Sequence, residues 1–471
     1  MSDSDRTNEA EPRDSTERTS GRISPVDRRS FLVTAAGSAG IGLLAGCSGG
    51  GDSADSGSTD SGSESTDSGS ESTDSGTVGS SDSSSSEPIT LGASASLSGA
   101  TSIEGRATRL GYQIWADQLN DTGSILTDGD ETGLLGRPVE VTTYDDESTP
   151  SRAVNLYRRL ITQDDVDLLA GPYSSAISNA VLPIIEQNQQ AAVMPFVSDR
   201  SVFRERDISY AVMCIGHSGT YLKGAIDLGM ERGAETVGVV YEDTAFPASI
   251  AETHSAYAKE QGLEVVHEAS YPRDINDYTS VMNQLQSTDP DIVIGGGYTV
   301  DAISLGEAAQ SLGFSPDIFA FMVGALSPDT YDSLGSAALG ISGDLWWADW
   351  FDVPNNDALV TAIEDYSDQS PSEVDYHVAG GYGSALVMEQ AVRNVGSLDQ
   401  DAIAEELHAL EMEVPWGNGL YAVDDQGVQT AHEPAMCQWQ ESDGGDELSQ
   451  EAIWPPDVAT ADPIYPHPGW E

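Results

Sequence analysis

The chain has 471 residues, with 78 acidic and 20 basic side chains and a formal charge of −58. An acidic excess of this size, without a basic patch, argues against a nucleic-acid-binding protein, because such proteins neutralise phosphates with clustered lysines and arginines. The region from Pro88 to Glu471 is too long for one hydrophobic core and long enough for two lobes.

The first 46 residues have the pattern of an export signal. The pair Arg28-Arg29 precedes an uncharged, mildly apolar run from Phe31 to Gly46. This run is shorter than the roughly 20 residues of a membrane-spanning helix. The pair resembles a twin-arginine signal, and Leu44-Ala45-Gly46-Cys47 resembles a lipobox. We therefore predict a twin-arginine lipoprotein signal at 1–46 and lipidation of Cys47. The alternative is a buried N-terminal helix with an incidental cysteine.

Residues 47–87 are predicted to be the lipidated cysteine followed by an unfolded tether. The stretch after the cysteine is almost entirely Ser, Gly, Asp, Glu and Thr, with a seven-residue repeat that begins at Thr59. No position of the repeat is apolar, so it cannot form the seam of a coiled coil. Such a stretch buries too little apolar surface to offset its ordering entropy. A tether of this kind suits a domain held above a membrane.

Acidic residues also extend through the folded region, and only two of the basic residues are lysines, Lys223 and Lys259. Self-repulsion of this size opposes compaction unless salt screens it. The Debye length falls from about 10 Å at 0.1 M salt to about 3 Å at 1 M. The composition resembles that of haloarchaeal proteins, which function in molar salt. We therefore expect a halophilic protein that loses stability when salt is removed.

From Ile89 onward, short apolar strands alternate with amphipathic helices, which predicts an α/β architecture. The first set has strands at 89–93, 139–144, 166–170 and 191–195, with helices at about 105–119 and 151–162 and another from about 174. The second set has strands at 236–241, 263–266, 291–295 and 317–321, with helices at about 218–232, 247–261 and 278–286 and another after 299. Later helices are expected near 356–367 and 378–395. Two such sets predict two doubly wound lobes that bind ligands beyond the carboxyl ends of their strands.

Four segments near these strands carry a resemblance to a known family. They are Leu97-Ser98-Gly99, Leu135-Gly136-Arg137-Pro138, Gly171-Pro172-Tyr173-Ser174-Ser175 and Val240-Tyr241-Glu242-Asp243. In their order and spacing they resemble the solute-binding proteins of ABC importers, in the branched-chain amino acid and amide class. The resemblance implies the periplasmic-binding-protein type I fold, in which a three-crossover hinge joins two doubly wound α/β lobes. It places the first lobe at 88–212 plus 346–433 and the second at 213–345 plus 434–471.

The resemblance also implies a function. The chain is expected to be a lipoprotein on the outer face of the cytoplasmic membrane that delivers a small polar solute, such as a branched-chain or other amino acid, to an ABC permease and its ATPase. Alternatives with the same fold are a binder of amides, urea or small carboxylates, and a sensory ligand-binding module. An enzyme is disfavoured, because no nucleophile–base pair or metal-ligand cluster is evident. We expect no cofactor or metal, and a monomer.

The ligand site implied by the resemblance begins with four serines. Ser175 and Ser198 match positions that bind a ligand carboxylate. Ser98 and Ser174 lie in two of the segments that carry the resemblance. Backbone N–H groups at a helix start, with hydroxyls beside them, suit an anion. Alternatively, Ser174 or Ser175 is only the N-cap of its helix.

Aromatic residues complete the implied site. Phe196 matches a position that contacts the ligand through its backbone carbonyl, whereas Phe246 and Tyr298 match rings that lie over the ligand. Either Tyr376 or His377 falls near a further side-chain position. Each of these aromatic residues is alternatively part of the core.

One departure from the family concerns the ligand ammonium group. Amino acid binders of the family place a glutamate in the loop after the strand at 317–321, but here that loop, Val323–Ser327, contains no acid. Glu104 and Asp301 are the candidate replacements, although each is alternatively a surface acid. If neither serves, the ligand lacks an ammonium group, because burying one without a partner is costly.

Three other residues leave their roles open. Cys214 and Cys437 either form a disulfide or remain buried thiols. Asn120 begins a lone glycosylation sequon.

Overall fold

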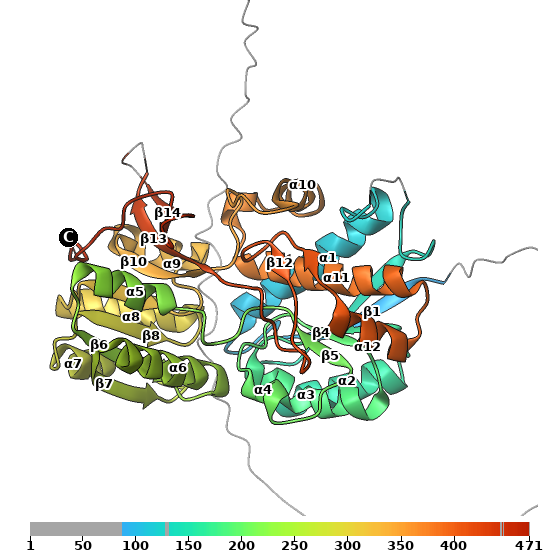
Figure 1. The fold of residues 1–471 in the computed structure, drawn as a ribbon, viewed down its shortest axis with the longest axis horizontal. Helices are drawn as coiled ribbons and strands as arrows, with labels where there is room; N and C mark the ends of the chain where they lie inside the picture. The colour runs from blue at the N-terminus through green and yellow to red at the C-terminus, as the bar shows by residue number, and fades with distance from the viewer. Residues whose placement is uncertain (1–86, 128–130, 443–444, 446, 471) are drawn as a thin grey trace, which may run out of the picture. The chain divides into compact units, whose positions relative to one another are not determined.

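Two large sheets, one parallel and one mostly parallel, each flanked by helices, form the fold of the computed structural model (Figure 1). The structure describes residues 87–127, 131–442, 445 and 447–470. These residues belong to one unit, Ser80–Glu471. The predicted signal, Cys47 and nearly all of the predicted tether lie outside the described residues.

The first lobe is built on a five-stranded parallel sheet in the order β2-β1-β3-β4-β5. Its strands are β1 (Ile89–Ala95), β2 (Val139–Asp145), β3 (Leu168–Ala170), β4 (Ala192–Met194) and β5 (Ala211–Met213). Its helices are α1 (Ser102–Asp121), α2 (Pro150–Thr162), α3 (Ser175–Asn188) and α4 (Ser201–Arg204). Later segments complete the lobe: α10 (Asn356–Tyr366), the 3-10 turn η2 (Pro371–Glu373), α11 (Tyr376–Val395), α12 (Gln400–Ala409), β11 (Met412–Glu413) and β12 (Leu420–Tyr421).

The second lobe is built on a seven-stranded sheet in the order β14-β13-β10-β9-β8-β6-β7. Its parallel strands are β6 (Thr236–Glu242), β7 (Glu264–Tyr271), β8 (Ile292–Gly296), β9 (Ile318–Phe321) and β10 (Ile341–Leu345). Two antiparallel strands, β13 (Ala435–Glu441) and β14 (Leu448–Trp454), extend it beyond β10. Its helices are α5 (Lys223–Arg232), α6 (Ala245–Gln261), α7 (Thr279–Gln286), α8 (Thr299–Leu312), α9 (Pro328–Leu334) and the 3-10 turn η1 (Gly335–Ala338).

The chain passes between the two sheets three times: after β5, after β10 and before β13. The three passages pack together where Gly216, Trp346 and His432, one residue from each passage, lie in contact. A Cβ on Gly216 would lie 2.6 Å from the Trp346 ring and 2.8 Å from the His432 carbonyl oxygen. Because real Cβ atoms do not approach other atoms so closely, only glycine fits where these passages pack together. The predicted type I fold, with two lobes and a three-passage hinge, is confirmed.

Close packing of α1 against α11 positions the first lobe's contribution to the cleft. A Cβ on Gly111 would lie 2.1 Å from the Val378 carbonyl oxygen, and one on Gly381 would lie 2.3 Å from the Thr108 carbonyl oxygen. The two helix backbones are therefore in direct contact. Their packing fixes the first turns of both helices, which carry Glu104 and His377.

The structure changes several predicted boundaries. The helix expected from 218 begins at Lys223, and the strand expected at 263–266 runs on to Tyr271 as β7. The strands β5 and β10 were not anticipated. β5 has only three residues, and β10 reads Ile-Ser-Gly-Asp-Leu, whose polar residues suggest a loop although all five residues are buried. Cys214 and Cys437 are buried free thiols.

Candidate functional site

A small cavity lies at the carboxyl ends of strands from both sheets. Residues that follow β3, β4, β8 and β9 line it, together with the first turns of α6 and α11. Its volume is about 10 Å³, which is about what a single water molecule needs. The lobes must therefore separate, or side chains must turn, to admit a solute. The lining residues are Tyr173, Ser174, Phe196, Ser198, Tyr221, Phe246, Tyr298, Val323, Tyr376 and His377.

Six residues that were proposed from the sequence line this cavity: Ser174, Phe196, Ser198, Phe246, Tyr298 and Tyr376. The sequence left open the choice between Tyr376 and His377, and the structure places both in the lining. Tyr173 and Val323 were missed although each follows a strand end that was already singled out. Tyr221 was also missed, because it lies in the first inter-lobe passage, where no strand pattern marks it.

Two of the proposed serines are not among the lining residues, because their hydroxyls are engaged elsewhere. The exposed Ser98 donates to the Asp145 carboxylate, with 2.7 Å between the oxygens. The buried Ser175 hydroxyl accepts from the backbone N–H groups of Ser198 and Asp199, at 3.1 and 3.2 Å. Ser175 therefore ties the start of α3 to the loop after β4, and this bond holds Ser198 at the cavity.

The two proposed acids also lie outside the lining. Glu104 is buried, and its Oε1 accepts from the backbone N–H and the hydroxyl of Thr299, at 3.0 and 2.8 Å. Asp301 accepts from the backbone N–H of Tyr298 and from the Tyr278 hydroxyl, both at 2.9 Å. Both carboxylates thus bond to protein groups around the start of α8.

Ser174 has a strained backbone at the point where α3 begins. Its φ is +89° and its ψ is 155°. Residues other than glycine rarely adopt this backbone conformation. The Ser174 side chain does not cap α3, so its hydroxyl is available to the cavity that it lines. Strain of this kind concentrates at ligand sites, where the surrounding structure enforces it. The 14-residue helix α3 also directs the positive end of its dipole toward this point.

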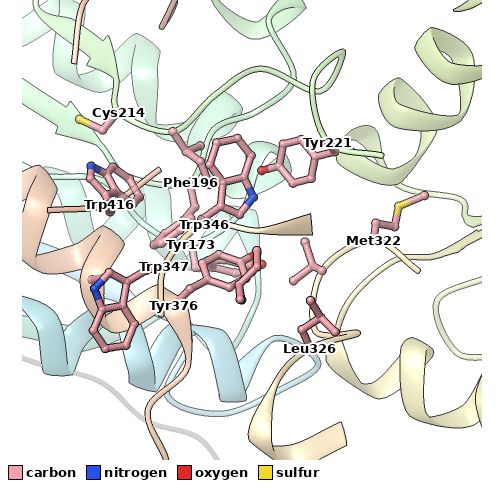
Figure 2. Packing of buried hydrophobic residues seen from close by; sticks show 14 of the residues in the cluster. Tyr173, Phe196, Cys214, Tyr221, Met322, Leu326, Trp346, Trp347, Tyr376 and Trp416 are labelled. Atoms are coloured by element: carbon pink, nitrogen blue, oxygen red, sulfur yellow. The ribbon is translucent and has the colours of Figure 1, made fainter. Parts of the chain in front are cut away.

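Aromatic rings form most of the cavity wall, and Figure 2 shows four of them, Tyr173, Phe196, Tyr221 and Tyr376. The Tyr173 ring contacts rings from both lobes. Its centroid lies 5.5 Å from that of Phe196 in the first lobe and 6.0 Å from that of Tyr298 in the second. Tyr221 lies 5.3 Å from Phe246, and its hydroxyl shares a hydrogen bond with the Ser198 hydroxyl. Six of the ten lining residues are Phe or Tyr, so the wall favours a ligand with an apolar or aromatic body.

The Tyr298 hydroxyl is a buried polar group of this wall. It makes no hydrogen bond of good geometry with a described residue, and the Ser174 and Thr244 side chains lie near enough to interact with it. The guanidinium of Arg273 lies 5.3 Å from the centre of the Tyr298 ring and forms an ion pair with Glu242 at 2.9 Å. Because unpaired buried hydroxyls are costly, the Tyr298 hydroxyl is suited to bond a polar atom of a ligand.

His377 brings a titratable group to the cavity. Its Nδ1 is in very short contact with the Asp375 carboxylate, and its Nε2 lies 3.2 Å from the Tyr173 hydroxyl. The ring stacks on Tyr376, with 4.1 Å between centroids and 23° between planes. Asp375 is the N-cap of α11, where it also accepts from the His377 backbone N–H at 3.0 Å.

The loop after β9 contributes an apolar side chain, Val323, to the lining, and none of the ten described lining residues is an acid. A further buried acid is Asp344 on β10, which accepts from the Trp346 indole N–H at 2.7 Å. Burial raises the pKa of Asp344 to about 7. Asp344 interacts electrostatically with Tyr221 and Tyr376, and it does not itself line the cavity.

The described residues contain neither a candidate metal-ligand group nor a candidate membrane-spanning helix. No group of three or more His, Cys, Asp or Glu side chains in this part of the chain has an arrangement that could hold a metal ion. Within the same residues, no helix is both long enough and apolar enough to cross a membrane.

Comparison with known proteins identifies the family. The model of a periplasmic binding protein family matches residues 88–445. The chain belongs to the periplasmic binding protein family. It is a family of solute-binding proteins rather than of enzymes. One relative of this periplasmic binding protein is the Leu/Ile/Val-binding protein homolog 7 of Brucella abortus (strain 2308). The two are 24% identical over 374 residues, which cover 76% of this chain and 90% of the relative.

Solved structures share the fold of this periplasmic binding protein. The substrate-binding protein LivJ of Streptococcus pneumoniae, in complex with isoleucine, has a TM-score of 0.65 at 18% identity. The match covers 78% of this chain and all 100% of LivJ. A solute-binding protein of R. palustris, in complex with 4-hydroxybenzoate, has a TM-score of 0.67 at 17% identity, over 78% of this chain and 96% of that one.

Proposed function

We propose that this periplasmic binding protein captures a small organic carboxylate between its lobes and delivers it to an ABC permease. The observation that carries the proposal is the start of α3, where the strained Ser174 and the nearby Ser198 line a cavity shared by both lobes. Helix-start N–H groups with adjacent hydroxyls bind a carboxylate without a counter-charge. The role that the resemblance implies for Ser198 fits this chemistry, and Ser174 would take the role that the resemblance implied for Ser175.

Two ligand classes carry such a carboxylate. Branched-chain and other amino acids are suggested by the relatives that are named for Leu, Ile and Val. Aromatic or branched carboxylates without an ammonium group are favoured by the cavity itself, which is mainly aromatic and has no acid among its ten lining residues. An amide or urea would leave the start of α3 without an anion.

Closure of the lobes would complete the site. Ser174, Phe196 and Tyr376 come from the first lobe, whereas Phe246 and Tyr298 come from the second. A ligand that touches both groups binds the closed form better than the open form, so it shifts the equilibrium by that difference in affinity. The closed form would then be the one that docks on the permease.

The anchor is a separate part of the proposal. Cys47 ends a sequence that resembles a lipobox, and a Ser- and Gly-rich tether follows it. Lipidation at Cys47 would keep the domain near its permease and raise its effective concentration there. Replacing Cys47 with Ala should move the exported protein from the membrane fraction to the medium. If the Cys47→Ala protein stays with the membrane, the anchor is not at Cys47.

A thermal-shift screen tests the ligand proposal. The purified chain is heated in high-salt buffer with leucine, isoleucine, benzoate, 4-hydroxybenzoate, 4-methylpentanoate, acetamide or urea. Binding to the folded state raises the melting temperature in proportion to the logarithm of ligand concentration. We expect at least one carboxylate to do so and the amides to have no effect. A shift with acetamide or urea alone would contradict the carboxylate proposal.

A further inference from the structure

Asp375, His377 and Tyr173 form a continuous hydrogen-bonded chain that ends at the cavity. Asp375 contacts Nδ1 of His377, and Nε2 of His377 lies 3.2 Å from the Tyr173 hydroxyl. His377 is 0% exposed and Tyr173 is 3% exposed, and both residues line the cavity. Of the ten lining residues, His377 is the one whose side chain can carry a positive charge.

Of the three carboxyl groups near His377, Asp375 is the one that the structure favours in its ionised form. Burial raises the pKa of Asp375, but the attraction of His377 and the hydrogen bonds outweigh it and leave that pKa below its ordinary value. At Glu104 burial is the dominant effect and the pKa is raised, with His377 opposing it only in part. Burial also dominates at Asp344. The ionised partner of His377 is therefore Asp375, whereas burial favours the neutral forms of the other two acids.

The titratable groups that face His377 come from several elements. They are Asp375 and Tyr376 beside it on α11, Tyr173 after β3, Glu104 on α1 and Asp344 on β10. The phenols of Tyr173 and Tyr376 have pKa values well above the ordinary value because they are buried, so both stay neutral. Asp375 is therefore the carboxylate that pairs with His377, whereas burial favours the neutral forms of Glu104 and Asp344.

The protonation of His377 sets what Tyr173 offers to the cavity. An ionised Asp375 keeps a hydrogen on Nδ1 of His377. When the ring is neutral, Nε2 accepts the Tyr173 O–H, and the phenol offers only its oxygen lone pairs to the cavity. When the ring is an imidazolium, Nε2–H donates to the phenol oxygen, and the Tyr173 O–H is released to donate elsewhere. Only the second arrangement presents a donor and a positive charge to an anion.

We propose that His377, oriented by Asp375, is the charge partner of the bound anion, and that Tyr173 donates a hydrogen bond to the same ligand. The inference rests on the proposed function and narrows it: the preferred ligand is an organic monocarboxylate with an apolar or aromatic body and no ammonium group. The imidazolium of His377 then supplies the positive charge that the carboxylate of such a ligand meets. An amino acid zwitterion loses by comparison, because its ammonium group meets the same positive charge and no acid in the lining.

A matched pair of ligands tests this preference. Leucine and 4-methylpentanoate differ by a single amino group, so their affinities isolate the effect of that group. We expect isothermal titration of the purified chain in high-salt buffer to show tighter binding of 4-methylpentanoate.

Three variants separate the roles within the chain. His377→Gln should weaken carboxylate binding by roughly tenfold or more, as expected for a lost hydrogen bond to a charged group. Tyr173→Phe keeps the imidazole and should weaken binding less. Asp375→Asn removes the negative charge that pairs with the imidazolium, so it should also weaken carboxylate binding. His408→Gln on α12, outside the cavity, serves as the control.

The outcomes distinguish the two proposals. If His377→Gln binds 4-methylpentanoate or benzoate as tightly as the wild type does, the role of His377 is wrong and the proposed function stands. Tighter binding of leucine than of 4-methylpentanoate would overturn the ligand class. If no carboxylate or amino acid binds the wild-type chain, the proposed function fails as well. Should His377→Gln fail to fold by circular dichroism, the carboxylate affinity of Asp375→Asn decides the matter: unchanged affinity would overturn the role of His377.

Discussion

Glu104 in the first turn of α1 accepts two hydrogen bonds from Thr299, the first residue of α8. The two residues belong to different lobes, and Glu104 is only 1% exposed. Thr299 donates both its hydroxyl and a backbone N–H at the positive end of a helix, where a carboxylate is favourable. This contact therefore stabilises the closed arrangement of the two lobes, although neither Glu104 nor Thr299 lines the cavity.

Glu104→Ala should weaken ligand binding through closure alone. Losing two hydrogen bonds of roughly 0.5–1.5 kcal/mol each costs about 1–3 kcal/mol, which favours the open form by that amount. We expect small-angle scattering to show a larger radius of gyration and titration to show a weaker affinity. Thr299→Val, which keeps the backbone N–H bond, should have the same effect at a smaller size. An unchanged radius for both variants would show that this contact does not hold the lobes together.

Ser174→Gly should raise stability while it weakens binding. Glycine adopts a φ of +89° without the steric penalty of a side chain, so relief of strain should exceed the added entropy of the unfolded chain by about 1 kcal/mol. Loss of the hydroxyl removes a donor from the carboxylate site. Urea denaturation and ligand titration measure the two effects. A less stable Ser174→Gly protein would show that this backbone is not strained.

Gly216→Ala should disrupt the hinge. The new methyl group would meet the Trp346 ring at 2.6 Å and the His432 carbonyl oxygen at 2.8 Å, one contact from each of the other passages. Overpacking of this kind costs roughly 1–3 kcal/mol. Gly219→Ala in the same passage is a matched control, because its Cβ would meet only the His217 side chain, at 3.0 Å. Equal melting temperatures for the two variants would contradict this account.

Asp344 should make stability depend on pH. Its pKa is about 7 in the folded protein because it is buried, against an ordinary value near 4 when unfolded. Its contribution is therefore fully present below about pH 4 and is lost as pH rises through about 7. Asp344→Asn keeps an acceptor for the Trp346 indole. Its free energy of unfolding, relative to that of the wild type, should increase by a few kcal/mol as pH rises between those limits. Parallel stability curves for the two proteins would exclude a titrating Asp344.

Salt should stabilise the folded chain. The formal charge of −58 creates repulsion that salt screens as the Debye length falls from about 10 Å to about 3 Å. The melting temperature should rise steadily when KCl is increased from about 0.1 M to 1 M. Sucrose at matched osmolality, which does not screen charge, is the control. Melting temperatures that do not change with KCl would contradict a halophilic protein.

The fold could be predicted from the sequence to the extent that apolar periodicity marks it. Long segments such as Thr236–Glu242 and Ser102–Asp121 have clear strand and helix patterns. In contrast, β10 was missed because burial on both faces, rather than a pattern, makes Ile341–Leu345 a strand. The strands β13 and β14 lie beyond the alternating βα units, and they join the sheet by antiparallel pairing that no local signal announces.

The site could be predicted where it follows strand ends, as at Ser174, Phe196 and Tyr298. Sequence alone could not show that the Ser175 hydroxyl is used within the protein, because its partners, Ser198 and Asp199, lie on another loop. Nor could it place Tyr221, which reaches the cavity from a passage between the lobes. Such residues are defined by long-range geometry rather than by local pattern.

The most direct test of the central claim is a crystal structure with the carboxylate that produces the largest thermal shift. The account predicts the ligand between the lobes, with its carboxylate at the start of α3 within hydrogen-bond distance of Ser174 or Ser198 and its body against the aromatic wall. A ligand bound outside this cavity, or one whose carboxylate lies away from α3, would contradict it.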